Sequence, residues 1–185
     1  NVSYHQPHAP CTPPAYYFNK YMDADFPEIP EGNWEADFPN TQNGLPVNAW
    51  RVDPNTRPIR EYRAGYYGCI EQIDHQIGRL IYKLPKNTII IFLSDHGEML
   101  GDHGWIRKRS AYEGSARIPF MIWMPPAYAK ELGIKQGTVV DTPVEIMDVM
   151  PTILDIAGIE IPEGVDGMSL LDVMRGKETD RTYIH

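Results

Sequence analysis

Residues 88–119 read TIIIFLSDHGEMLGDHGWIRKRSAYEGSARIP, and this stretch decides the fold. It opens with an unbroken apolar run at residues 89–93 that is rich in β-branched side chains. Such a run predicts a buried strand of a parallel sheet, covered on both faces. The run stops abruptly at residues 94–97, SDHG. Because catalytic and ligand-binding groups of open α/β sheets gather at the carboxyl ends of strands, we expect a catalytic or metal-binding edge here.

The polar residues of this loop suggest two kinds of chemistry. Asp95 and His96 offer a carboxylate oxygen and an imidazole nitrogen, which can help to hold a divalent cation, although two ligands are too few for an oxygen-preferring ion. Lys108 offers a fixed ammonium that can stabilise negative charge, and Arg107 next to it leaves a one-residue ambiguity. On these residues alone, a turn capped by Asp95 with a structural His96 explains the pattern equally well.

The flanking segments predict an α/β architecture with a mostly parallel central sheet. Apolar residues at helical period predict a helix over residues 60–84, which Pro85 ends before a tight turn leads into the strand. A second buried strand is expected at residues 120–124, so that residues 88–124 form a strand–loop–strand unit. Further elements are predicted as short strands at residues 138–140 and 182–184 and as helices at residues 146–157 and 169–174.

Residues 9–58 form a long excursion between the first motif and the helix. They hold most of the 17 prolines, together with many Gly, Asn and Asp residues. Long loops inside a compact domain are usually functional, so we expect a substrate-side rim. Its aromatic anchors would be Tyr16, Tyr17, Tyr21, Phe26, Trp34, Phe38 and Trp50.

Length and composition limit the classes of protein to consider. A chain of 185 residues suggests one domain with a substantial core. The net charge of -8 disfavours a nucleic-acid partner, and no 18-residue apolar run predicts a membrane span. Two cysteines leave the redox compartment undecided. Since residues 1–4 read as the end of a strand and no Met precedes them, we expect a catalytic domain truncated at its N-terminus.

Four segments, taken in order, resemble the C-terminal half of the catalytic domain of the sulfatases, which belong to the alkaline-phosphatase-like superfamily. Residues 3–10, SYHQPHAP, resemble the PHxP segment of that family, and residues 67–80 resemble the helix that precedes its metal strand. SDHGEMLGDHG, followed by a Lys five residues before Glu113, resembles its metal and substrate loop. Residues 143–171 resemble its closing section. Four segments in the family's order are far more specific than one short motif.

The resemblance implies roles for individual residues. His8 corresponds to a histidine that contacts the sulfate and can protonate the leaving oxygen, and Lys108 corresponds to the substrate-binding lysine. Asp95 and His96 correspond to two calcium ligands, with Mg²⁺ or Mn²⁺ as alternative ions. The remaining ligands would come from a pair of Asp residues in the missing N-terminal part of the domain. His103 is a candidate for binding the leaving part of the substrate, with a purely structural role as the alternative.

Cys11 has to be distinguished from the nucleophile of the family. Sulfatases attack with formylglycine, which is made from Cys or Ser within C/S-x-P-x-R. Cys11-Thr12-Pro13-Pro14-Ala15 has the Cys and Pro spacing but lacks the Arg. In the family the nucleophile lies far upstream of the PHxP segment, so we interpret Cys11 as a decoy. The formylglycine is expected upstream of this chain, and the chain alone is expected to be inactive.

The function implied is hydrolysis of a small-molecule or glycan sulfate ester, as in bacterial sulfatases. A phosphonate monoester or phosphodiester hydrolase of the same superfamily fits the DHG and PHxP motifs too. A non-catalytic module that kept only the fold is the third reading. The family resemblance alone suggests a periplasmic or secreted protein.

Overall fold

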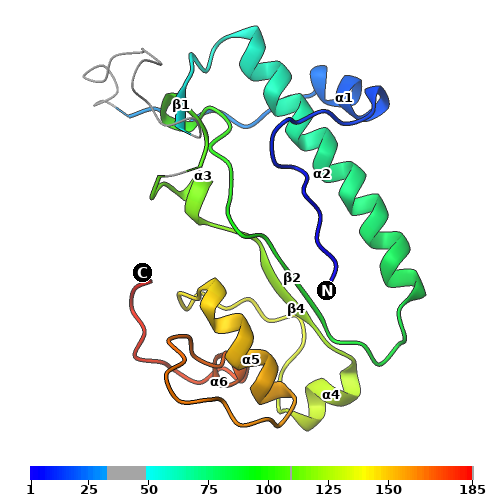
Figure 1. The fold of residues 1–185 in the computed structure, drawn as a ribbon, viewed down its shortest axis with the longest axis vertical. Coiled ribbons are helices and arrows are strands. Elements are labelled where there is room, and N and C mark those ends of the chain that lie inside the picture. Colours follow the sequence, from blue (N-terminus) through cyan, green and yellow to red (C-terminus); the bar gives the residue numbers. More distant parts are fainter. Residues whose placement is uncertain (33–48, 109, 185) are drawn as a thin grey trace. The chain divides into compact units, whose positions relative to one another are not determined.

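The computed structural model describes residues 1–32, 49–108 and 110–184 (Figure 1). The chain divides into two compact units. The first comprises Asn1–Pro85 and Phe92–Phe120, and the second comprises Lys86–Ile91 and Met121–His185. All the candidate site residues of the sequence analysis belong to the first unit.

The first unit is built on one long helix, α2 (Arg57–Lys83), where the sequence predicts a helix over residues 60–84. A proline in its first turn suits the start of a helix, because the amide it lacks would have no partner there. Ala64 and Cys69 are completely buried on its inner face. No helix of the described residues has the length and hydrophobicity needed to cross a membrane.

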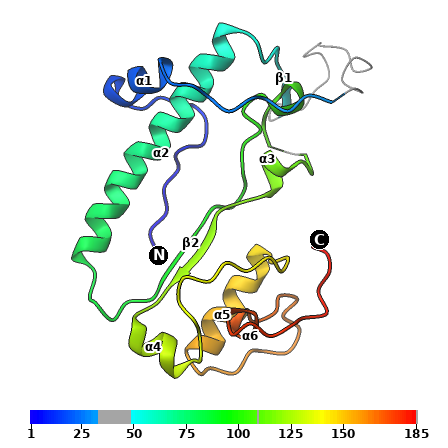
Figure 2. The same ribbon diagram turned by 180° about the vertical axis from the view of Figure 1, so that it is seen from behind.

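Two glycines of α2 let the N-terminal segment approach closely. A Cβ atom on Gly65 would lie 2.2 Å from the carbonyl oxygen of Cys11, and one on Gly68 would lie 2.8 Å from the ring of Pro13. The second helix of this unit, α1 (Ala15–Met22), runs directly against α2, as Figures 1 and 2 show from opposite sides. These small residues therefore fix the path of the segment that carries His8.

Three of the aromatic residues expected at a substrate rim, Tyr17, Tyr21 and Phe26, contact side chains of α2. The Tyr17 hydroxyl lies 2.8 Å from Nδ1 of His75. The rings of Tyr21 and Phe26 stack on Tyr67, with centroids 5.8 Å and 5.4 Å away. Trp34 and Phe38 lie outside the described residues. The sequence missed α1 because three prolines precede it and hide its short helical pattern.

A small antiparallel sheet also lies within the segments read as loops. Strand β1 (Ala49–Arg51) pairs with β3 (Trp105–Arg107), with Ala49 opposite Arg107 and Arg51 opposite Trp105. The guanidinium of Arg51 lies 4.9 Å from the centre of the Trp105 ring. A single turn of 3₁₀ helix, η2 (Asp102–Gly104), leads into β3. Three-residue strands give too short an alternation for sequence to reveal them.

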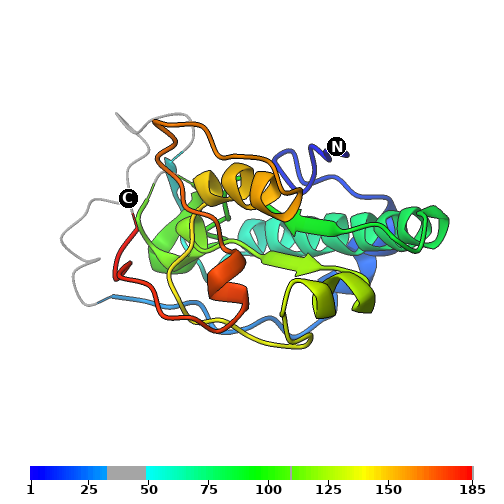
Figure 3. The ribbon, with the colours of Figure 1, turned by 90° about the horizontal axis from the view of Figure 1, so that it is seen from below.

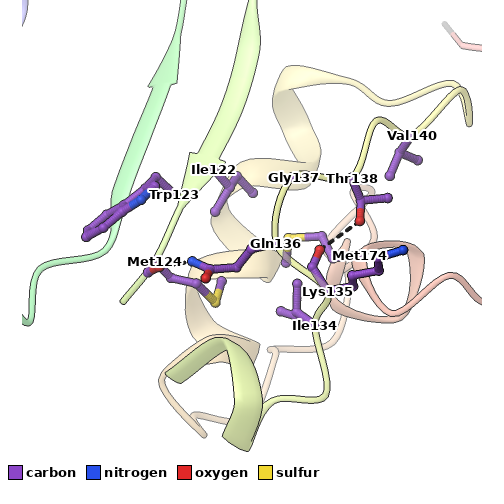
Figure 4. Close-up of a pocket in the computed structure, with 10 residues that line it drawn as sticks. All are labelled: Ile122, Trp123, Met124, Ile134, Lys135, Gln136, Gly137, Thr138, Val140 and Met174. Carbon is purple, nitrogen blue, oxygen red and sulfur yellow. Dashed lines mark hydrogen bonds between the residues drawn. The ribbon is translucent and has the colours of Figure 1, made fainter. Parts of the chain in front are cut away.

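The strand that opens the deciding stretch is β2 (Ile90–Leu93), and it forms a sheet with β4 (Phe120–Trp123). The arrows of the two strands point in opposite directions in Figure 4. Phe92 is 36% exposed and Trp123 is 48% exposed, so these strands are only partly buried, not covered on both faces as predicted. The mostly parallel central sheet of the prediction is not seen among the described residues, which contain two two-stranded sheets.

The second unit holds four short helical segments (Figure 3), which are α4 (Pro126–Glu131), η3 (Ile146–Asp148), α5 (Val149–Ile156) and α6 (Leu171–Met174). Its core is organised by the completely buried Asp148, which accepts the amide protons of Glu145 at 2.8 Å and Met168 at 2.9 Å. The structure assigns no strand to residues 138–140 or 182–184, where the sequence predicted two. Val139, for example, is 86% exposed and has no neighbouring strand to pack against.

Candidate active site

The DHG loop leaves β2 in a tightly bonded turn. Ser94 donates its hydroxyl proton to the carbonyl of His96 at 2.7 Å, and the amide of His96 donates to Oδ1 of Asp95 at 3.1 Å. The amide of Gly97 donates to the carbonyl of Ser115 at 2.8 Å, in the short helix α3 (Glu113–Ala116). A Cβ atom on Gly97 would lie 2.2 Å from the Gly114 carbonyl oxygen. The glycine of the motif is therefore required by this close backbone approach.

The ring of His96 is oriented by a backbone carbonyl. Its Nδ1 lies 2.7 Å from the carbonyl oxygen of Gly97. Because a carbonyl can only accept, Nδ1 carries the proton and Nε2 keeps its lone pair. The ammonium nitrogen of Lys108 lies 2.6 Å from that Nε2 atom and donates to it. The loop thus brings together two of the residues that the sequence singles out, twelve positions apart.

Asp95 extends this cluster toward solvent. Its side chain is 86% exposed, and its Oδ2 lies 3.6 Å from Nε2 of His96. One ion with bonds of about 2.3–2.6 Å can bridge two atoms at this separation. A histidine that donates from Nδ1 to a carbonyl is also typical of a metal ligand that binds through Nε2. Asp95 and His96 therefore fit a divalent cation.

The cation site is nevertheless only partial in this chain. Within residues 1–32, 49–108 and 110–184, no group of three or more His, Cys, Asp or Glu side chains could hold a metal ion. Calcium takes six to eight oxygen ligands, so further ligands must be supplied by groups beyond this pair. The Lys108 ammonium meanwhile occupies the lone pair that a metal would use.

His8 joins the cluster from the N-terminal segment. Its amide donates to the carbonyl of His5 at 3.1 Å, which closes a turn, and its Nδ1 lies 2.8 Å from the carbonyl oxygen of Ala9. As in His96, Nδ1 therefore carries a proton, and Nε2 is the nitrogen that can take up or release one. The His8 ring lies 6.0 Å from the His96 ring and 5.0 Å from the His5 ring, measured between centroids.

His103 lies in a separately structured part of the loop. Its backbone is left-handed, with φ of 56°, and its amide donates to the carbonyl of Pro30 at 2.8 Å. Its ring packs on the ring of Tyr112 at 4.3 Å between centroids. Burial raises the pKa of the neighbouring Asp102 carboxyl, and the charge of Arg63 opposes that rise. The structure therefore gives His103 an aromatic partner, and its substrate role stays a prediction.

Glu98 is a residue of the site that the sequence analysis did not select. Its Oε1 accepts the amide proton of Arg107 in a short hydrogen bond and that of Leu100 at 3.4 Å. Burial raises the pKa of its carboxyl, while these amides oppose the rise. Burial also raises the pKa of the nearby Tyr62 phenol, and the charge of Glu98 acts in the same direction. An acid directly after DHG and before an apolar pair was the available signal.

Cys11 has the environment of an unreactive thiol. Its Sγ donates to the carbonyl of Pro7 at 3.3 Å, and burial raises its pKa to about 11. Since the thiolate is the nucleophilic form, this thiol is poorly suited to attack at neutral pH.

A cavity of about 120 Å³ in the second unit does not form a second site (Figure 4). Its polar groups are directed at the backbone, since Gln136 donates to the carbonyl of Met124 at 2.8 Å and Thr138 to that of Lys135 at 2.7 Å. The other side chains that line it are mostly apolar. No set of polar groups converges on this space as it does at a binding site.

Comparison with known proteins identifies the class of protein to which this site belongs. The family description "Sulfatase" matches residues 1–159. The chain belongs to the sulfatase family.

Individual relatives agree with this assignment. The arylsulfatase of Clostridium perfringens (strain 13 / Type A) is 43% identical over 190 residues, a match that covers 100% of this chain and 39% of that protein. The phosphonate monoester hydrolase of Agrobacterium radiobacter has a similar structure, with a TM-score of 0.78 and 27% identity over 97% of this chain and 38% of that one. A protein solved with its substrate D-glucosamine-2-N,6-O-disulfate gives a TM-score of 0.56 and 35% identity over 63% of this chain and 24% of that one. The chain thus spans about two fifths of the length of the arylsulfatase.

Proposed function

We propose that the protein to which this chain belongs hydrolyses sulfate esters, with Lys108, His8, Asp95 and His96 forming one part of its active site. The observation that carries the proposal is the 2.6 Å contact between Lys108 Nζ and His96 Nε2, with the His8 ring 6.0 Å from that of His96. Lys108 and His8 therefore both approach His96, and the exposed Asp95 carboxylate lies 3.6 Å from the Nε2 atom of the same ring. This is the combination of charge and acid–base groups that transfer of a sulfuryl group requires.

Lys108 and His8 have distinct tasks in this reaction. As the bond to the leaving oxygen breaks, negative charge is stabilised by a cation already fixed nearby, and the Lys108 ammonium is held in place by His96. His8, in its protonated form, would deliver the Nε2 proton to the departing alcohol oxygen, while Nδ1 keeps its proton and donates it in a hydrogen bond to the Ala9 carbonyl. His103, beside Tyr112, would contact the leaving part of the substrate.

Asp95 and His96 would hold the divalent ion, for which calcium is our proposal. When bound, it neutralises charge on the sulfate oxygens. His96 would present Nε2 to the ion because its Nδ1 donates a hydrogen bond to the Gly97 carbonyl. The attacking group, proposed to be a formylglycine, comes from outside this chain.

The test uses the full-length protein and an aryl sulfate such as 4-nitrophenyl sulfate. Lys108→Ala should lower kcat/KM by roughly 100-fold or more, as expected for loss of a charge that acts in the transition state. Lys130→Ala, which removes an exposed lysine from α4, serves as the matched control and should leave kcat/KM unchanged. Absence of sulfate ester turnover by the wild-type protein, or full activity of the Lys108 variant, would contradict the proposal.

A phosphonate monoester hydrolase is the second candidate. It is favoured by the structural similarity to the Agrobacterium radiobacter enzyme, which extends over 97% of this chain. The same Lys108, His8 and metal pair can serve either ester, since both leave negative charge on a tetrahedral centre. The ratio of kcat/KM for 4-nitrophenyl sulfate and 4-nitrophenyl phenylphosphonate separates them. A ratio well above one supports a sulfatase, and a ratio well below one supports the alternative.

The substrate class follows from the proposed sulfatase activity. A sulfated glycan is the natural candidate, because one structural relative was solved with a disulfated glucosamine. Small aryl or alkyl sulfates are the alternative. Comparing sulfate release from a glucosamine sulfate and from an aryl sulfate at equal concentration distinguishes the two.

A further inference from the structure

The Glu98 carboxylate is hydrogen-bonded to the backbone next to the Lys108–His96 pair. Glu98 lies two residues after His96, and Arg107 lies one residue before Lys108. The hydrogen bond from the Arg107 amide to Oε1 of Glu98 therefore links the two chain segments that carry the pair. A second amide, that of Leu100, donates to the same oxygen at 3.4 Å.

The backbone of Arg107 shows why this tie matters. Arg107 has φ of 71°, a left-handed conformation that a residue with a side chain adopts only when its surroundings hold it there. Both of its backbone polar groups are held, since its amide donates to Glu98 and its carbonyl accepts the Met99 amide at 2.9 Å. The left-handed turn ends β3 and redirects the chain at the residue that precedes Lys108.

We infer that Glu98 is a positioning residue for Lys108, acting through the backbone of Arg107. Its carboxylate holds Arg107 in the left-handed turn, and the turn directs the Lys108 ammonium to Nε2 of His96. Glu98 does not touch the substrate in this scheme. The inference rests on the proposed function, because Lys108 is given its role there.

Charge and burial fit this role. The Glu98 side chain supplies an oxygen that accepts the Arg107 amide proton, and its charge adds modestly to the strength of that hydrogen bond. Glu98 is partly buried and lies near Tyr62 of α2, which reduces competition from water for this hydrogen bond. A surface glutamate would not fix the turn in this way.

The kinetic test is a double-mutant cycle in the full-length protein. Glu98→Ala should lower kcat/KM for 4-nitrophenyl sulfate by roughly 10–100-fold, the usual cost of losing a group that orients an active-site residue. In a Lys108→Ala background the same change should cost less than about twofold, because the residue that Glu98 positions is already gone. Glu98→Gln should recover most of the activity, since its amide oxygen can still accept the Arg107 proton. Glu61→Ala, which removes an exposed ion pair with Arg57 on α2, is the control.

A second measurement does not depend on turnover. Acetylation of Lys108 by acetic anhydride, followed by peptide mass spectrometry, should be several-fold faster in Glu98→Ala than in wild type, with the exposed Lys130 as internal reference. Faster labelling of Lys108 supports the inference even if the protein proves inactive on sulfate esters, so failure of the proposed function is recognised separately. Unchanged labelling, an equal loss of kcat/KM in both backgrounds, or a Glu98→Gln variant as impaired as Glu98→Ala would overturn it.

Discussion

Lys108 Nζ lies 2.6 Å from His96 Nε2, so the atom proposed to bind a metal ion is also the atom that holds the Lys108 ammonium. A nitrogen lone pair accepts one partner at a time. Binding of a cation by Asp95 and His96 must therefore displace Lys108 from His96 and leave two positive charges close together. The two states differ in which cation contacts Nε2 of His96.

The first prediction follows from this competition. In the full-length protein, Lys108→Ala should bind calcium about three- to tenfold more tightly than wild type, because both the competing donor and its charge are removed. Isothermal titration after chelation and dialysis measures the change, and Lys130→Ala should match wild type. Weaker or unchanged calcium binding by Lys108→Ala would show that Lys108 does not compete for His96.

The second prediction concerns the buried ion pair of the second unit. Arg181 donates to both carboxylate oxygens of Asp148, with Nη2 3.0 Å from Oδ1, and the Asp148 side chain is completely buried. The carboxylate in turn raises the pKa of the Arg181 guanidinium. Arg181→Ala would leave a buried charge without its cation, which typically costs about 3–5 kcal/mol.

Chemical denaturation of the full-length protein, with hydrogen exchange of the second unit as a local probe, measures this loss. Lys177→Ala is the matched control because its ion pair with Asp172, at 2.9 Å, is exposed. Such surface pairs contribute about 0–1 kcal/mol. Equal stabilities of the two variants would mean that the Asp148–Arg181 pair is not essential to the core.

The structure brings together four residues that the sequence selected, whereas it does not show the sheet that the sequence predicted. His8, Asp95, His96 and Lys108 could be selected because their types and spacing reflect chemistry that is local to short motifs, and the structure brings them together. Glu98 was not selected because its position directly after DHG was its only signal, and its partner, the backbone amide of Arg107, leaves no pattern in the sequence.

The secondary structure was also predictable only in part. The helix α2 was predictable because its apolar face repeats over 27 residues, whereas β1 and β3 have three residues each. A β-branched run at residues 138–140 predicted a strand that has no partner in the structure. Strand formation depends on a neighbour remote in sequence, which local propensity cannot supply.

The third prediction concerns Cys11 and pH. Its pKa is raised from the usual 9.0 to about 11, so the folded state retains the thiol proton over that range. At pH 8 the thiolate fraction is then about 100-fold lower than for an ordinary cysteine, and iodoacetamide should alkylate Cys11 about 100-fold more slowly than it does in urea. Because the folded state binds the extra proton, this residue's contribution to stability falls as pH rises from 9 to 11. Peptide mass spectrometry measures the alkylation rate of Cys11 with and without urea. Equal rates would contradict the buried environment of the Cys11 thiol.

The fourth prediction compares two glycines. Gly97→Ala should inactivate the full-length protein and destabilise it by about 2–3 kcal/mol, because the new Cβ would lie 2.2 Å from the Gly114 carbonyl oxygen and force the DHG loop from α3. Gly78→Ala is the matched change, since nothing lies within 4 Å of its Cβ position in the middle of α2. That variant should be stabilised by about 0.5–1 kcal/mol. Thermal unfolding and aryl sulfate turnover check both, and a fully active Gly97→Ala would disprove the tight packing.

The fifth prediction is that the 185-residue chain, purified alone, does not turn over sulfate esters. Its described residues supply Lys108 and His8 but only two candidate cation ligands, and the Cys11 thiol is neither in the formylglycine motif nor reactive at neutral pH. The charges can stabilise the sulfuryl group, but the ester is not cleaved unless a nucleophile bonds to sulfur. Turnover of 4-nitrophenyl sulfate in excess calcium should therefore equal that of a Lys108→Ala version of the same chain, with the full-length protein as the positive control. Turnover above this background that disappears in the Lys108 variant would mean that the chain carries its own nucleophile.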